Sequence, residues 1–250
     1  MKLKYFFSTI LLLLINVLNG QYVGEVIYQY HSNLPLEKHL CGETMLFFGK
    51  DSSIYVHLST INNSTEEIMH STLTINSSDN AGFPIYINKA DKKFQQKVSV
   101  NFNYKAIIHD VLKEIKWEVT DSFKTNSDGL KLVKAKTDFG GRNYIVWFCP
   151  DIPYDSGPFK LWGLPGLILE AETVDGSASI KYKSINLHEL NKTQINTPNM
   201  GQSDYQYSYF NYCNSLDRFE KELLAQGSTD NVIKVTRPKA DAQLEIGFKK

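Results

Sequence analysis

The sequence lacks an excess of charge of either sign. Its 250 residues carry 27 basic and 27 acidic side chains, so the formal net charge is zero. Dedicated nucleic-acid-binding proteins usually carry a strongly basic surface, so this balance argues against a nucleic-acid partner. Apolar residues make up 42% and charged residues 22%, as in ordinary folded domains. We therefore expect one globular domain rather than a disordered chain.

Cysteine is also scarce. The chain has only Cys41, Cys149 and Cys213, and no two of them form a Cys-x-x-Cys motif. This excludes a zinc ribbon and a thioredoxin-like redox pair. Because the number is odd, at least one thiol has no partner within the chain. Two alternatives stay open: one structural disulfide of unassigned pairing, or three buried thiols.

Common catalytic signatures are missing. The sequence contains no His-Glu-x-x-His, Gly-x-Ser-x-Gly or P-loop pattern. The six histidines are scattered, and the only metal-like spacing is His39-x-Cys41, with His31 nearby. A tetrahedral zinc site would need a second ligand pair, which is absent. We predict no metal and no cofactor, and keep a metal carrier using His39 and Cys41 as a minor alternative.

Long apolar runs are absent except at the amino terminus. Lys2 and Lys4 precede an apolar stretch that extends to Leu18 and is followed by Gly20. The stretch is short for a membrane span and is typical of a secretory signal peptide. We expect cleavage after residue 20, leaving an exported chain 21–250 that is periplasmic or secreted and has no transmembrane anchor. An uncleaved membrane anchor is the alternative.

What the sequence does contain is aromatic residues and short extended segments. With 14 Tyr and 14 Phe it favours β-structure. The expected strands are Val23–Tyr30, Glu43–Phe48, Ser53–Leu58, Met69–Ile75, Pro84–Asn88, Phe94–Val100, Lys116–Asp121, Leu130–Phe139, Asn143–Cys149, Leu167–Thr173 and Ala178–Leu187. Hairpin-like spacing, with Asp128-Gly129 and Asp175-Gly176 as turns, predicts a mainly β fold: a single curved antiparallel sheet, half-barrel or sandwich-like. One C-terminal helix is expected at Leu216–Gln226, where Leu216, Phe219 and Leu223 share a face.

Residues 150–166 form a connection rich in proline and glycine between two expected strands. Leu164-Pro165-Gly166-Leu167 predicts a type II turn in which Gly166 takes a positive φ. The segment is also apolar, with Phe159, Trp162 and Leu164 among its members. Such a rigid apolar loop either packs over the end of the core or contacts a partner, and packing is the favoured interpretation.

Two further groups of residues have chemical potential. Asp151 and Asp155 lie on this loop, and Arg142 lies one strand away. A carboxylate pair for acid–base chemistry is one interpretation, and an Arg–Asp ion pair that anchors the loop is the favoured one. Separately, Tyr205, Tyr207 and Tyr209 alternate and share one face of an extended chain. They form either a contact surface for a sugar or peptide, or a half-buried edge strand.

The segment Gly163–Ile168 reads GLPGLI, and Gly141-Arg142, Val146-Trp147-Phe148, Ile152-Pro153 and Gly157-Pro158 accompany it. This compound motif resembles the GLPGLI family of exported proteins, which is widespread in Bacteroidetes. The resemblance implies export and an antiparallel β architecture but supplies no activity, and some members are associated with TonB-dependent outer-membrane transport. One departure is Leu132, where members commonly have a cysteine.

Together these observations predict an exported cell-envelope protein that binds a partner or ligand without catalysis, in a role accessory to outer-membrane transport. The alternative is a hydrolase using Asp151 and Asp155. The expected binding residues are Phe159, Trp162, Leu164, Tyr205, Tyr207 and Tyr209. The expected structural motif residues are Arg142, Asp155, Gly157, Pro158, Gly163, Leu164, Pro165, Gly166, Leu167 and Ile168.

Overall fold

The computed structural model describes residues 22–33, 41–58, 84–99, 105–189 and 205–207. Its strands are β1 (Tyr22–Ser32), β2 (Gly42–Phe48), β3 (Ser52–His57), β4 (Ile85–Asn88), β5 (Lys93–Ser99), β6 (Lys105–Val111), β7 (Glu118–Thr125), β8 (Lys131–Phe139), β9 (Arg142–Cys149), β10 (Leu167–Thr173), β11 (Ala178–Glu189) and β12 (Tyr205–Tyr207). The described part contains no helix, and so none able to cross a membrane. The expected strand Met69–Ile75 and helix Leu216–Gln226 lie outside the described residues.

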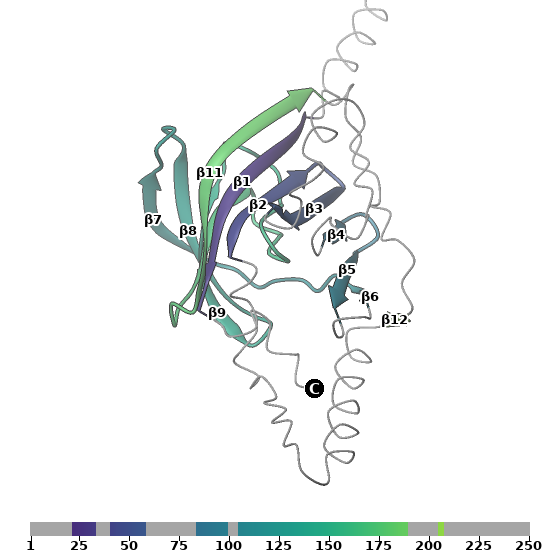
Figure 1. Cartoon of the computed structure of the whole chain (residues 1–250). Helices are drawn as coiled ribbons and strands as arrows, with labels where there is room; N and C mark the ends of the chain where they lie inside the picture. Colours follow the sequence, from purple (N-terminus) through teal and green to yellow (C-terminus); the bar gives the residue numbers. More distant parts are fainter. Residues whose placement is uncertain (1–21, 34–40, 59–83, 100–104, 190–204, 208–250) are drawn as a thin grey trace, which may run out of the picture.

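All the strands join one sheet in the order β12-β6-β5-β4-β3-β2-β1-β11-β10-β9-β8-β7. Strands β1 to β11 pair antiparallel, and the short β12 adds to β6 in parallel. The sheet consists of two meanders, which we call the N-arm (β1–β6) and the C-arm (β7–β11). They are joined by the long pairing of β1 with β11 (Figure 1). The prediction of a mainly β, antiparallel sheet is confirmed, and the sheet is not closed into a barrel.

The connection from β6 to β7, residues 112–117, shows how strongly the sheet is curled. In a flat sheet β6 and β7 would lie ten strand spacings apart, roughly 48 Å. From Val111 to Glu118 the chain makes seven residue steps, which reach about 25 Å at most. The sheet must therefore curve round, and the connection crosses its open side (Figure 1). We call residues 112–117 the strap.

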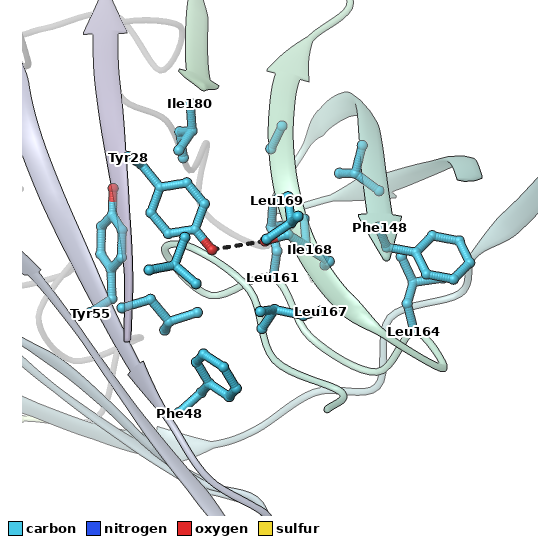
Figure 2. Close-up of a cluster of buried hydrophobic side chains, with 14 of the residues drawn as sticks. Tyr28, Phe48, Tyr55, Phe148, Leu161, Leu164, Leu167, Ile168, Leu169 and Ile180 are labelled. Carbon is cyan, nitrogen blue, oxygen red and sulfur yellow. Dashed lines mark hydrogen bonds between the residues drawn. The ribbon is translucent and has the colours of Figure 1, made fainter. Parts of the chain in front are cut away.

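The main core lies on the inner face of this curved sheet. Figure 2 shows Tyr28 and Phe48 of the N-arm facing Leu167 and Leu169 of the C-arm. In β9 the core residues alternate: Tyr144, Val146 and Phe148 are buried, and the residues between them are only half-buried. This period of two is the pattern of a strand that buries one face.

Two of the hairpin turns contain a glycine in the left-handed region. Gly129 and Gly176 have positive φ angles of 79° and 70°, as the predicted turns require.

The two cysteines in the described residues form no disulfide with each other. Cys41 and Cys149 both carry thiols. The Sγ atom of Cys41 instead lies 3.2 Å from the backbone N of Ser32. Burial raises the pKa of the Cys149 thiol above its usual value, which keeps it protonated and unreactive. Cys213 lies outside the described residues.

Candidate functional site

The motif loop, residues 150–166, fills the inside of the curled sheet. Leu161 and Leu164 are each 1% exposed, and Ile168, just beyond the loop, is fully buried. The hydroxyl of Tyr28, on the opposite arm, donates a 2.8 Å hydrogen bond to the carbonyl of Ile168 (Figure 2). The loop therefore packs into the core, as the favoured interpretation has it. Leu164 has almost no surface left for a partner, and Phe159 and Trp162 are half-buried.

The glycines of the motif are explained by close packing. A Cβ on Gly166 would lie 2.4 Å from the carbonyl oxygen of Cys149, and one on Gly157 would lie 2.8 Å from two carbons of Ile168. The predicted type II turn is wrong, because Gly166 has no positive φ; the amide of Gly166 instead bonds the carbonyl of Leu164 at 2.8 Å, a γ-turn around the intervening proline. Among the glycines of the motif loop, Gly163 has a positive φ, at 91°.

Two tryptophans fasten the strap to the motif loop. The indole N–H of Trp117 donates to the carbonyl of Trp162 at 2.9 Å. The indole N–H of Trp162 donates to the carbonyl of Lys113 at 3.0 Å. Each segment thus supplies one donor and one acceptor to the other. We call this reciprocal pair the indole latch.

A buried lysine fastens the other side of the loop. Lys89, whose side chain is 6% exposed, forms an ion pair with Asp155. Its Nζ also donates to the carbonyl of Gly49 and the hydroxyl of Ser156, each at 3.0 Å. Burial lowers the pKa of Lys89, and the bond to Asp155 opposes that shift. Asp155 therefore anchors the loop to the N-arm.

The predicted partner of Arg142 is wrong. Arg142 is 5% exposed and its Nη1 lies 3.1 Å from a carboxylate oxygen of Asp175, in the β10–β11 turn, rather than from a loop carboxylate. Hydrogen bonds from Ser177 hold the pKa of Asp175 down at about 2, with a smaller contribution from Arg142. Asp175 lies near Arg142 because β9 and β10 are paired; Asp151, nearer in sequence, lies beyond the far end of β9.

The remaining predicted groups are not brought together. Asp151 is exposed on the loop, and the neighbouring carboxylate, Asp155, is held by Lys89. Among the described residues no three His, Cys, Asp or Glu side chains are placed to hold a metal, and His39 lies outside them. Tyr205 and Tyr207 pair with Ala106 and Ile108 in the edge strand β12. Tyr209 lies outside the described residues.

A groove that the sequence did not reveal lies at the rim of the C-arm. It has a volume of about 430 Å³ and is lined by Lys116, Glu118, Lys136, Thr137, Asp138, Asn143, Tyr144 and Val174. We call it the rim groove. Its residues come from the strap, β7, β8, β9 and the β10–β11 turn, so they meet only in the folded chain. The one sequence signal is an alternation of charge, Lys-x-Glu at 116–118 and Lys-x-Asp at 136–138.

Comparisons with known proteins leave the activity of the chain open. Residues 91–170, about a third of the chain, match a family described as a protein of unknown function (Porph_ging). This span includes the strap and the motif loop. No curated protein matches the chain.

The chain is also similar to two crystal structures of PNGF-II, in space groups P21 and C2. Sequence identity is 16% in both, with TM-scores of 0.54 and 0.53. The similarity covers 78% and 79% of this chain and 33% of the PNGF-II chain. The chain thus spans about a third of the length of PNGF-II. At this identity the likeness shows a shared fold alone.

Proposed function

We propose that this protein is an exported cell-envelope protein of the GLPGLI type, which binds a partner or small ligand at its rim groove and performs no catalysis. One observation carries the proposal. The polar groups that anchor the motif loop are engaged within the chain, whereas the charged side chains around the rim groove are exposed. The groove is thus a place where the described surface offers charged groups to another molecule.

The arrangement supports binding better than hydrolysis. A general acid or base must reach the reacting group of a substrate with its own proton or lone pair. Asp155 would first have to release Lys89, which would leave a buried ammonium group without its carboxylate partner. The rim groove has a volume within the roughly 300–1,000 Å³ of small-ligand sites, together with convergent polar groups.

The site of action follows from the amino-terminal signal and the family resemblance. The signal peptide at residues 1–20 would direct the chain out of the cytoplasm, and Bacteroidetes proteins with the GLPGLI motif are exported. An outer-membrane transport complex is the partner class that the resemblance suggests. Intact-mass measurement of the envelope-purified protein checks the export step: the expected chain starts at Gln21, and a chain that retains Met1 contradicts export.

The binding proposal is tested by crosslinking the full mature protein in its native envelope and identifying what is captured. A double variant, Lys136→Met with Asp138→Asn, alters only exposed groove residues and should lose the captured partner. The matched control is Lys181→Met with Glu172→Gln, an ion pair on the same arm at 3.9 Å. Capture by the control but not by the groove variant supports the proposal. Identical capture by both, or a hydrolytic activity abolished by Asp155→Asn, overturns it.

The binding residues expected from the sequence are tested in the same assay. Trp162→Ala removes a half-buried aromatic side chain of the motif loop, and Tyr207→Ala removes one of the alternating tyrosines, on β12. If either variant remains folded and loses the partner, the binding surface includes that residue as well as the rim groove. The proposal in its present form expects neither loss.

A further inference from the structure

The rim groove carries charges of both signs in a regular arrangement. Glu118 of β7 lies opposite Lys136 of β8 in the strand register. Asp138 is two residues further along β8, and so shares a face with Lys136. Lys116 precedes Glu118 by two residues and lines the same groove. Two ammonium groups and two carboxylates therefore surround one hollow, with no net charge.

Several other charged side chains of the C-arm form ion pairs, whereas these four do not. Elsewhere on the C-arm, Lys124 bonds Glu170 at 2.7 Å and Arg142 bonds Asp175 at 3.1 Å. Within the described part of the chain, none of the four groove charges lies within 4.0 Å of an opposite charge. The groove thus gathers four exposed charges that have no ion-pair partner among the described residues.

The walls of the groove are held in place before any ligand arrives. The hydroxyl of Thr137 donates to the carbonyl of Lys116 at 2.8 Å and fixes the strap against β8. The amide of Val174 donates to the carbonyl of Asn143 at 2.9 Å and fixes the turn against β9. Tyr144, 3% exposed, lies between these two walls in the sheet. A preformed site loses less conformational entropy when it binds.

We propose that the rim groove binds short peptides through both of their charged termini, an inference that rests on the proposed function and names its ligand class. The free α-ammonium group bonds Glu118 or Asp138, and the α-carboxylate bonds Lys116 or Lys136. The exposed amide of Asn143 is placed to bond a peptide group between them. The groove volume of about 430 Å³ suits a di- or tripeptide, toward the lower end of small-ligand sites.

Other ligand classes fit this charge pattern less well. A purely anionic ligand would meet two carboxylates, and a purely cationic one two ammonium groups, so in each case attraction is offset by repulsion. A neutral sugar would remove water from four charges without supplying an opposite charge to any of them. A zwitterion supplies one charge for each sign, at opposite ends of an extended backbone.

The test is a titration of the full mature protein with trialanine, in which NMR monitors the amide chemical shifts of the protein. We expect saturable shifts at Asn143 and its neighbours, with a Kd on the order of 1 mM. N-acetylated trialanine and trialanine amide each lack one terminal charge and should bind about tenfold more weakly or not at all. Lys136→Met with Asp138→Asn should abolish the shifts, and the control pair Lys181→Met with Glu172→Gln should retain them.

Three results would overturn the inference: no shifts with trialanine, equal affinity for the blocked peptides, or stronger binding of glucose than of trialanine. Failure of the peptide-binding inference can be told apart from failure of the proposed function. If the groove variant still loses an envelope partner while trialanine does not bind, the groove is a binding surface for another ligand class. If trialanine binds and no envelope partner is captured through the groove, the peptide assignment stands alone.

Discussion

The two arms of the sheet differ in what lies on the face away from the main core. In the N-arm that face carries a second apolar cluster, made by Phe47, Ile54, Val56 and Tyr86, all no more than 8% exposed. In the C-arm the corresponding face carries Trp147, beneath the ammonium group of Lys124 at 4.4 Å. The N-arm strands β2–β4 are therefore buried on both faces, whereas the C-arm buries one face and exposes charged groups on the other.

This difference separates stability from binding within one sheet. A strand buried on both faces has no side chains to spare for a ligand, because each one packs against protein. A strand buried on one face offers alternate residues to solvent, and Lys136, Asp138 and Asn143 of the rim groove are such residues. In the described part the sheet has two edge strands, β12 beside the N-arm and β7 in the C-arm, and β7 is the edge nearer the rim groove. Its charges and its irregular register with β8 discourage pairing with another strand.

The largest expected effect tests the double burial of the N-arm. Ile54→Ala should lower the free energy of unfolding by about 3 kcal/mol, because Ile54 is 1% exposed and its loss leaves a cavity. Ile145→Ala, on the outer face of the C-arm, removes a half-buried side chain and should cost about 1 kcal/mol. Urea unfolding of both variants measures the difference. Equal costs would mean that the outer faces of the two arms are equally buried.

A smaller loss of stability is expected when the ion pair between the N-arm and the motif loop is removed. Lys89→Met removes the ion pair to Asp155 and two further hydrogen bonds, and should cost about 2 kcal/mol, because half-exposed Asp155 can regain water. The matched control is Lys92→Met, whose ion pair with Glu114 is exposed on both sides. That variant should stay within about 0.5 kcal/mol of the parent. Thermal unfolding of the two variants side by side would show whether burial decides the cost.

The indole latch should contribute about 1 kcal/mol for each hydrogen bond. Trp117→Phe and Trp162→Phe keep an aromatic ring and remove one donor each. Because both bonds hold the same two segments, the double variant should lose less than the sum of the single losses. Hydrogen exchange of the strap amides should accelerate in each. Strict additivity, with unchanged exchange, would show that the two bonds act independently.

The smallest expected effect is on the stability of the protein at acidic pH. The pKa of Asp175 is about 2 in the folded protein against an ordinary 3.8, so its ionised form stabilises the fold. This contribution is present above about pH 4 and is lost as pH falls toward 2. Since Asp175 is 59% exposed, solvent screening limits it to less than about 1 kcal/mol. Asp175→Asn should flatten the stability profile between pH 4 and pH 2, while NMR titration of the parent gives the pKa directly. A carboxyl that titrates near 3.8 would contradict the bonds from Ser177.

Much of the sheet could be predicted because strand signals are local. Alternating or continuous apolar residues, broken by glycine and polar turns, indicated β2, β9 and β10 to within a residue or two. The strand β6 was missed because its sequence, KAIIHDV, shows no regular alternation of apolar and polar residues, and no glycine or proline precedes it closely. Trp117 was expected in a strand and lies instead in the strap, where its indole is needed as a donor to the motif loop.

Partners distant in the chain were not predictable in the same way. Lys89 finds Asp155 across 66 residues, and the groove joins residues from 116 to 174. Arg142 was expected to bond a carboxylate on the nearby loop and bonds Asp175, 33 residues away. Closeness in sequence was a poor guide to the partner of Arg142. Arg142 begins the eight-residue strand β9, and the loop follows its other end, more than about 20 Å away.

By itself the sequence determined most of the extended segments, the glycine turns at Gly129 and Gly176, and the apolar character of the GLPGLI segment. Backbone and side-chain preferences within a few residues decide these features. Only the tertiary structure decided that the motif loop fills the inside of a curled sheet and that four charges meet at its rim. Strand order and curvature decide those contacts, because they bring together residues that no local pattern relates.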